Sequence, residues 1–283
     1  MIKNCFHLCT KAWHNSLLCR DKYDSDTLWN AIAICALANG ITLYCLCLMS
    51  NHIHILLSGT EEQIEAFFRL LKRNIGRYLK GKYPETTYPV LEYDLFPVSD
   101  RKMFCREVAY ILRNPYKAGI SSPVSYRWNS ASAYFPSLPM TGIPLHKIPV
   151  LERRSLLHTR LPLPDTLSIA DGMITPSSFV DKIYVERMFG TSLIYFNMLK
   201  TWNLEDVVNA SHGEEVADSY SDEEVIRGIR EICTDVFRSP SPERLDTKGL
   251  ASLVRRVHSR YGCTRKQLMR LLPVDETLLD RIL

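Results

Sequence analysis

The sequence has no C-x-x-C pair, no secretory signal pattern and no apolar run long enough to cross a bilayer. Without paired cysteines, a structural zinc site is not expected. The nine cysteines are odd in number and scattered, several of them in apolar stretches where a thiol behaves as a small hydrophobic group. Together these absences predict a reduced, cytoplasmic protein with no membrane partner.

A strong excess of either charge is also missing. The 35 lysines and arginines against 31 acidic residues give a net charge of +4, which is too small to identify a polyanionic partner. The distribution of charge therefore matters more than its sum. At 283 residues and 46% hydrophobic content, the chain can bury a sizeable core and suggests one domain with additions, or two domains.

The first part of the chain reads as strand, helix, strand, strand. The predicted segments are residues 5–9, 26–39, 41–48 and 52–57. A turn at Met49-Ser50-Asn51 should join the last two into an antiparallel hairpin. Strand alternation then places Ile53, Ile55 and Leu57 on one face and His52 and His54 on the other.

A helix at residues 61–80, a strand at 93–98 and a second helix at about 100–114 are predicted next. Ser99 or Asp100 can cap the second helix, whose buried side carries Phe104, Val108 and Ile111. Pro115 disfavours helical geometry in the residue before it, so this helix should end at Asn114. Tyr110 and Asn114 then share one edge, with Tyr110 exposed in the last turn.

The helix at residues 61–80 has one basic face. No acidic residue lies between Arg69 and Lys82, and the basic positions recur at mostly helical spacing: Arg69, Lys72, Arg73, Arg77 and Lys80. This stripe is a candidate track for DNA phosphates. A simple solvated face is the alternative.

The later part of the chain changes in character after Tyr134, where prolines become frequent and predict a linker or an extended wrap. A capping-box pattern at Ser221-Asp222-Glu223-Glu224 opens a helical region that continues at residues 247–261, 264–272 and 276–283. The last two helices resemble a helix-turn-helix unit, although any small bundle has the same periodicity. The domains expected are thus a first domain at 1–135, a proline-rich connection with an accessory helical region at 136–220, and a helical tail at 221–283.

His52 and His54 raise a chemical question because they stand two apart in an apolar run. Residues i and i+2 of a strand face the same way, so the two imidazoles can share one cation. Half-exposed strand histidines without a metal are the alternative. A metal site needs a third ligand from elsewhere.

The stretches LMSNHIHILL and VAYILRNPYKAGI, followed by YRWNSASAYF, resemble the single-tyrosine HUH transposases, a family that includes the REP-associated tyrosine transposases. The resemblance covers roughly residues 1–135. It implies an α+β fold, with a ferredoxin-like or RRM-like antiparallel sheet flanked by helices (the HUH endonuclease domain), here followed by a mainly helical C-terminal extension. The Gly-Thr-aromatic signature common in the REP-associated branch is absent from the first strand.

Carried over to this chain, the resemblance makes His52 and His54 metal ligands, Asn114 the third ligand and Tyr110 the nucleophile. The cofactor implied is a divalent metal, Mg, for which Mn would substitute. A core aromatic residue and a helix cap are the alternatives for Tyr110 and Asn114.

The function implied is a DNA transposase or strand transferase that cleaves and rejoins single-stranded DNA near hairpins through a 5′-phosphotyrosine link. Duplex DNA bound by the C-terminal tail and a second copy in a homodimer are further expected partners. Two alternatives stay open. One is a non-catalytic or domesticated sequence-specific DNA-binding regulator, and the other is a nuclease or replication initiator of the same chemistry.

Overall fold

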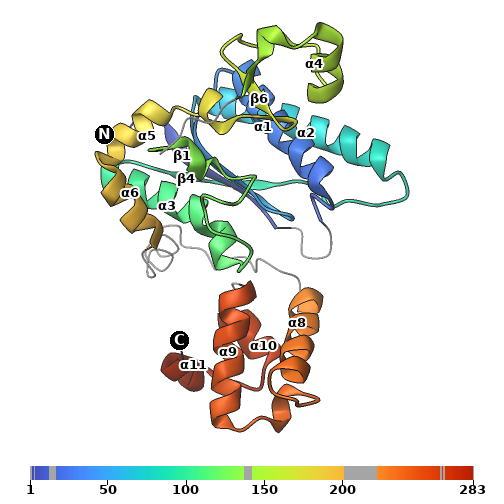
Figure 1. Cartoon of the computed structure of the whole chain (residues 1–283), viewed down its shortest axis with the longest axis vertical. Coiled ribbons are helices and arrows are strands. Elements are labelled where there is room, and N and C mark those ends of the chain that lie inside the picture. Colours follow the sequence, from blue (N-terminus) through green and yellow to red (C-terminus); the bar gives the residue numbers. More distant parts are fainter. Residues whose placement is uncertain are drawn as a thin grey trace.

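A four-stranded antiparallel sheet in the order β2-β3-β1-β4 forms the centre of the N-terminal part (Figure 1). The computed structural model describes residues 2, 4–12, 17–136, 142–200, 222–261, 263 and 265–282. The strands are β1 (Cys5–Thr10), β2 (Thr42–Leu48), β3 (Ile53–Ser58) and β4 (Tyr93–Pro97). Helices α1 (Lys22–Ala38) and α2 (Glu61–Lys82) pack together on one face, and α3 (Arg101–Lys117) lies on the other. This is the expected α+β fold with an antiparallel sheet flanked by helices.

The predicted hairpin between β2 and β3 is confirmed, and its register sets the rest of the sheet. β3 pairs with β1 on its other side, so that Cys9 lies opposite His54 and His7 opposite Leu56. Thr10 closes the start of β3, because its hydroxyl accepts a hydrogen bond from the Ile53 amide. The alternation of β3 therefore places His54 on the face that α3 covers.

Helix ends follow local capping. Asp21 caps α1 by accepting from the Asp24 amide, so this helix begins four residues earlier than the sequence pattern predicts. Thr60 and Gln63 form a capping box at the start of α2. Asp100 caps α3 as expected, by accepting from the Met103 amide.

The end of α3 differs from the prediction, because the helix runs through Pro115 to Lys117. Proline removes the amide that would bond to the carbonyl four residues earlier, at Ile111. The Asn114 side-chain amide replaces that donor, since its Nδ2 lies 3.1 Å from the Ile111 carbonyl oxygen and 3.2 Å from that of Tyr110. Tyr110 is consequently not in the last turn, and it is buried rather than exposed, at 6%.

The proline-rich region is folded rather than a linker. It forms a small sheet of three short strands, β5 (Ile143–Pro144), β6 (Ser168–Ala170) and β7 (Met173–Ile174), together with the helices α4 (Val150–Leu157), α5 (Lys182–Phe189) and α6 (Ser192–Lys200). Trp29 of α1 donates to the Ile174 carbonyl, and α5 and α6 contact α3. Buried residues from Cys5 to Leu199 belong to one hydrophobic core.

The segment at residues 126–135 ties the edge of β2 to α3. Tyr126 donates to the Leu48 carbonyl, and Asn129 donates to the Leu112 carbonyl at 2.7 Å. Ser130, in the short 3₁₀ turn Ser130–Ala133, accepts from the Leu46 amide. These bonds fix α3 against the sheet from one side.

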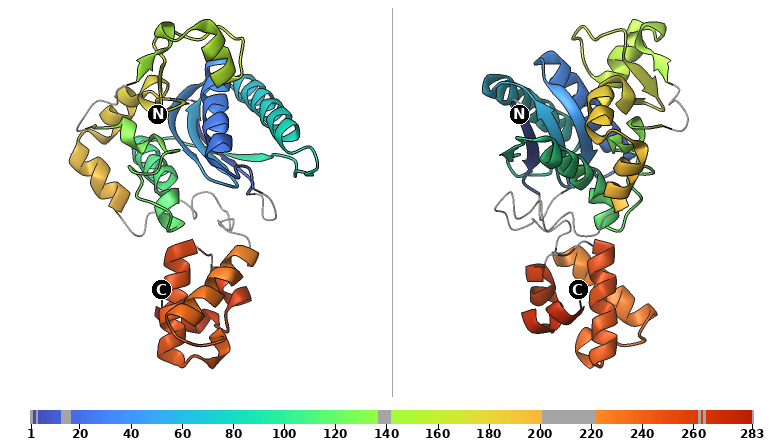
Figure 2. Two further views of the ribbon diagram at one scale, coloured as in Figure 1. Left: turned by 45° about the vertical axis from the view of Figure 1, so that its right-hand side comes forward. Right: turned by 90° about the vertical axis from the view of Figure 1, so that its left-hand side faces the viewer.

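The C-terminal region is a separate group of helices, α8 (Asp222–Asp235), α9 (Thr247–Tyr261), α10 (Arg265–Leu271) and α11 (Glu276–Ile282), visible in red and orange in Figure 2. It has its own core, which includes Val225, Leu253, Val254 and Leu279. Ser221 of the predicted capping box, Gly262 and Thr264 lie outside the described residues. None of the described helices combines the length and apolar character needed to span a bilayer.

Candidate active site

The two histidines of the H-x-H pattern lie side by side at the start of β3. Their ring centroids are 4.8 Å apart and the rings are nearly perpendicular. Both side chains are buried, and each is held through its Nδ1 atom. Nδ1 of His52 lies 2.7 Å from Oδ1 of Asn51, and Nδ1 of His54 lies 3.0 Å from Nε2 of His7. A neighbouring side chain thus engages the Nδ1 atom of each histidine.

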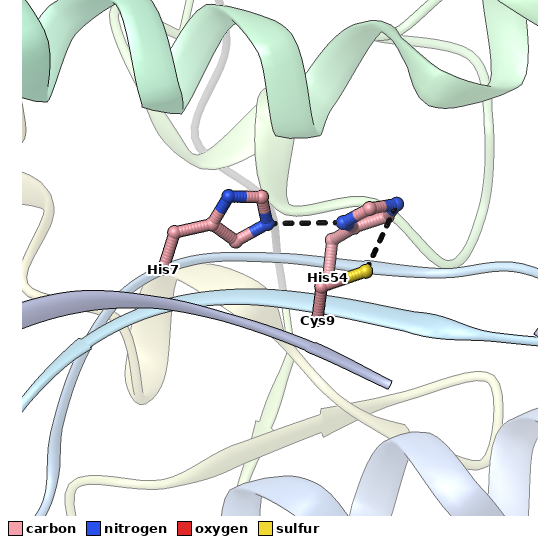
Figure 3. Close-up of side chains that lie close together, drawn as sticks. All are labelled: His7, Cys9 and His54. Carbon is pink, nitrogen blue, oxygen red and sulfur yellow. Dashed lines mark hydrogen bonds between the residues drawn. The ribbon is translucent and has the colours of Figure 1, made fainter. Parts of the chain in front are cut away.

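β1 adds two side chains to the same face, as Figure 3 shows. His7, on the neighbouring strand, places its ring against that of His54. The Cys9 sulfur lies 4.0 Å from Nε2 of His54. The potential ligand atoms of His7, Cys9 and His54 all lie within 4.8 Å of one another. These three residues form a possible metal-binding cluster that is compatible with a divalent ion.

α3 brings a second set of groups to the histidines. The Tyr110 ring lies 5.9 Å from the ring of His54 and 5.8 Å from that of His7, measured between centroids. Asn114 forms a side-chain hydrogen bond with His52. Because the Asn114 nitrogen donates to helix carbonyls, the oxygen is the atom that faces His52. One turn earlier, Oε2 of Glu107 lies 3.0 Å from Nδ1 of His7.

The electrostatic setting keeps His52 neutral. Burial, together with the nearby charge of Lys117, lowers the pKa of His52 to about 4, against a smaller upward effect of its hydrogen bond to Asn114. A neutral imidazole offers a lone pair to a metal at physiological pH. Lys117 also places its ammonium group 5.0 Å from the centre of the Tyr110 ring, so a positive charge lies beside the tyrosine.

Two sets of side chains that share His54 are candidate ligands for a divalent metal. His52, His54 and Asn114 offer two ring nitrogens and an amide oxygen, which leaves further coordination positions open. His7, Cys9 and His54 offer two nitrogens and a sulfur, a softer set. The structure thus brings His52, His54, Tyr110 and Asn114 together, as expected, and adds His7, Cys9, Glu107 and Lys117.

The predicted DNA-binding stripe lies elsewhere. All five of its side chains on α2, Arg69, Lys72, Arg73, Arg77 and Lys80, are exposed. Among the residues that the structure describes, no ion pair involves any of them. However, α2 covers the face of the sheet opposite to α3 (Figure 1). The stripe and the histidines are therefore on different sides of the sheet.

Sequence reasoning missed His7, Cys9, Glu107 and Lys117 as members of the site. His7 enters only through the pairing of β1 with β3, which no local pattern reveals. Glu107 precedes Tyr110 by three positions and Lys117 follows it by seven, so both belong to the same side of a continuous helix. A helix extended past Pro115 would have placed Lys117 on the same side as Tyr110 and so would have identified it.

Comparison with known proteins gives one family match. Residues 6–96 match the family model described as "Transposase IS200 like". This range contains His7, Cys9, His52 and His54, and it ends before Tyr110 and Asn114. No curated protein matches the chain.

A solved structure of a bacterial tRNA(His) guanylyltransferase (Thg1)-like protein in complex with ATP is similar at 15% sequence identity. The similarity covers 66% of this chain and 90% of that chain, with a TM-score of 0.35. Such a low score carries no argument about function.

Proposed function

We propose, from the match of residues 6–96 to the IS200-like transposase model, that the protein is a DNA strand transferase of the single-tyrosine HUH kind whose nucleophile is Tyr110. The observation that carries the proposal is the meeting of His52, His54 and the Tyr110 helix at one buried place. The proposal does not assign the protein to the REP-associated branch.

The proposed reaction exchanges one phosphodiester bond for another. The Tyr110 oxygen attacks a phosphorus atom of single-stranded DNA, the bond from phosphorus to the 3′-oxygen breaks, and the phenolic proton ends on the departing 3′-hydroxyl. The product is a 5′-phosphotyrosine link. A different 3′-hydroxyl then attacks this phosphorus, which returns the proton to Tyr110 and joins two strands. Because the bond energy stays in the covalent link, no ATP is consumed.

His52, His54 and Asn114 are the residues that we propose to hold a divalent metal, Mg, with Mn as a substitute. When bound, the ion would favour the phenolate and withdraw charge from the phosphate oxygens. The residues themselves orient the donor atoms: Asn51 holds His52, and α3 holds Asn114. Lys117 adds a fixed positive charge beside Tyr110.

We propose that the DNA substrate is a single strand beside a hairpin, and that the α2 stripe binds its phosphates. The support is the exposure of five basic side chains, for which the described residues contain no acidic partner within ion-pair distance. DNA that touches both the stripe and Tyr110 has to pass around the sheet. A homodimer is a further part of the proposal and rests on the family resemblance.

The C-terminal helices support a second candidate function, a sequence-specific DNA-binding regulator. α10 and α11 are two short helices joined by a turn, and they pack on a core of their own. In this alternative the tail binds duplex DNA through α11, and Tyr110 performs no chemistry.

The test is a covalent-linkage assay on the full chain. Purified protein is incubated with labelled, hairpin-bearing single-stranded oligonucleotides and Mg or Mn, and the mixture is separated under denaturing conditions. We expect a protein band that carries the label. Tyr110→Phe should abolish this band because it removes the attacking oxygen, and His52→Ala with His54→Ala should abolish it as well.

Tyr116→Phe is the matched control, because Tyr116 is an exposed tyrosine on the same helix. It should leave the band unchanged. A labelled band that persists in Tyr110→Phe contradicts the assignment of the nucleophile. Tight binding without any band, unaffected by removal of metal, favours the regulator.

A further inference from the structure

A chain of three polar side chains crosses the interior from α3 to the sheet. Oε2 of Glu107 lies 3.0 Å from Nδ1 of His7, off the direction of an ideal hydrogen bond, and Nε2 of His7 lies 3.0 Å from Nδ1 of His54. Glu107 is 0% exposed and His7 1%. Figure 3 shows the two imidazoles aligned through these nitrogen atoms.

We propose that His7, backed by Glu107, is a positioning residue that fixes the tautomer and the orientation of His54 so that Nε2 of His54 is the metal ligand. The inference rests on the proposed function, because it presumes a metal at His54. It assigns a role to two residues outside the H-x-H pattern.

The argument follows from the tautomers. An imidazole that binds a metal through Nε2 carries its proton on Nδ1. The Nδ1 proton of His54 then points at Nε2 of His7, which has to accept it. His7 in turn carries its own proton on Nδ1, the atom that faces the Glu107 carboxylate. This arrangement places one proton between His7 and His54 and a second proton opposite the Glu107 carboxylate.

His52 provides an internal parallel. Its Nδ1 atom is held at 2.7 Å by the Asn51 side-chain oxygen, so a metal would bind His52 through Nε2, as proposed for His54. Metal-binding histidines typically donate their second nitrogen to a carboxylate, a carbonyl or a similar acceptor. In this chain, the acceptor for Nδ1 of His52 is the side-chain oxygen of Asn51, and the acceptor for Nδ1 of His54 is the imidazole of His7.

Burial argues for a purpose beyond packing. Removing a carboxylate from water is unfavourable unless the surrounding geometry compensates it. Glu107 is fully buried on α3, as are Phe104, Val108 and Ile111. An apolar residue could fill such a position at a lower cost, so the polar chain is better explained by what it does for His54.

His7 is less suited to be a ligand itself. In the set His7, Cys9 and His54, a metal between the two imidazoles would have to break their 3.0 Å hydrogen bond. Its Nδ1 atom faces Glu107 instead. The two roles differ in what they predict for Cys9, which a ligand role requires and a positioning role does not.

The first experiment reads the tautomer directly in the full, metal-free protein. Two-bond ¹H–¹⁵N spectra distinguish Nδ1–H from Nε2–H imidazoles, and His52→Gln and His54→Gln variants assign the signals. We expect His54 to be the Nδ1–H tautomer. An Nε2–H signal for His54 would overturn the proposal. Because this readout uses no DNA, it does not depend on whether the covalent link forms.

The second experiment measures Mn²⁺ affinity by electron paramagnetic resonance for three variants with matched circular dichroism spectra. His7→Met removes the acceptor and should weaken binding about 10- to 100-fold, the usual cost of losing such a partner. His7→Gln places an amide oxygen close to the position of Nε2 and should restore most of the affinity. Cys9→Ser should change it little.

Unchanged affinity in His7→Met would overturn the proposal, and so would a loss in Cys9→Ser as large as that in His7→Met, since that pattern identifies ligands. If His7→Met does not fold, the tautomer of the wild-type protein still decides. Tyr110→Phe separates the two proposals. It should keep the tautomer and the Mn²⁺ affinity, so failure of the linkage assay alone contradicts only the proposed function.

Discussion

Asn114 shows how one side chain can serve both a helix and a site. Its nitrogen donates to the Ile111 carbonyl that Pro115 leaves without an amide partner, and its oxygen faces His52. The two alternatives raised by the sequence, a cap or a ligand, are therefore not exclusive. The cap-like hydrogen bonds fix the side chain with its oxygen toward His52.

Asp24 is the residue on which we base a stability prediction. Its carboxylate is fully buried and accepts from Tyr78, Tyr83 and Lys82, which joins the start of α1 to the end of α2. Replacing it in Asp24→Asn should lower the free energy of unfolding by about 3 kcal/mol, because Lys82 loses its fully buried partner and keeps only the more exposed Asp21. Urea unfolding at neutral pH measures this.

The contribution of Asp24 to the free energy of unfolding depends on pH, and the direction follows from its pKa. Burial raises the pKa of Asp24, but the hydrogen bonds from Lys82, Tyr78 and others outweigh it, so the pKa in the folded state lies below the ordinary value of 3.8. The ionised carboxylate thus contributes stability above that value, and the contribution is lost as the pH falls through the lower, folded-state pKa. The difference between wild type and Asp24→Asn should narrow below pH 3.8. Asp165→Asn, at an exposed position, is the control and should show no such difference.

At the scale of elements, α2 yields the next prediction. If its stripe binds phosphates, Arg69→Gln with Arg73→Gln should weaken binding of single-stranded DNA and flatten its salt dependence. The slope of the logarithm of affinity against the logarithm of salt concentration should fall by about 1.4, or about 0.7 for each lost contact. Fluorescence anisotropy over a salt series measures this.

Lys147→Gln with Arg154→Gln is the matched control, since it removes the same charge from exposed positions at and before α4. An equal effect of both pairs would mean that the loss of net charge, rather than the stripe, weakens binding.

Elements also show how much of the fold could be predicted from the sequence. The strands, the β2–β3 hairpin and the start of α3 follow from alternation and capping, which are local. Pro115 misled the prediction because the compensating hydrogen bond comes from the neighbouring side chain. The accessory helices of residues 136–220 were expected, but the short strands β5, β6 and β7 were not, because they gain stability by packing against α1, a contact distant in sequence.

The residues of the candidate site also differ in whether local sequence patterns predict them. His52, His54, Tyr110 and Asn114 were recognised from two short patterns and their order. His7 depends on the register of β1 against β3, which is set by pairing across the sheet. Glu107 becomes significant only once His7 faces it. Residues that act through others leave little trace in local sequence.

At the scale of the whole molecule, two separate hydrophobic cores imply two unfolding units. Leu253→Ala, at a fully buried position of α9, should destabilise the C-terminal helices by about 2–5 kcal/mol. It should leave covalent linkage by Tyr110 unchanged. Leu46→Ala, equally buried in β2, should instead lower the other transition and reduce linkage. Differential scanning calorimetry checks both, and a single transition that moves equally in the two variants would contradict the division.

The placement of α2 and α3 on opposite faces of one sheet also bears on the stiffness of the substrate. Duplex DNA keeps its direction over a persistence length of about 150 base pairs, so bending it sharply around a single small domain is costly. A single strand turns freely within a few nucleotides. A nucleic acid that contacts the α2 stripe and Tyr110 of the same molecule at once would therefore have to be flexible between the two contacts, and the architecture itself would discriminate against uninterrupted duplex.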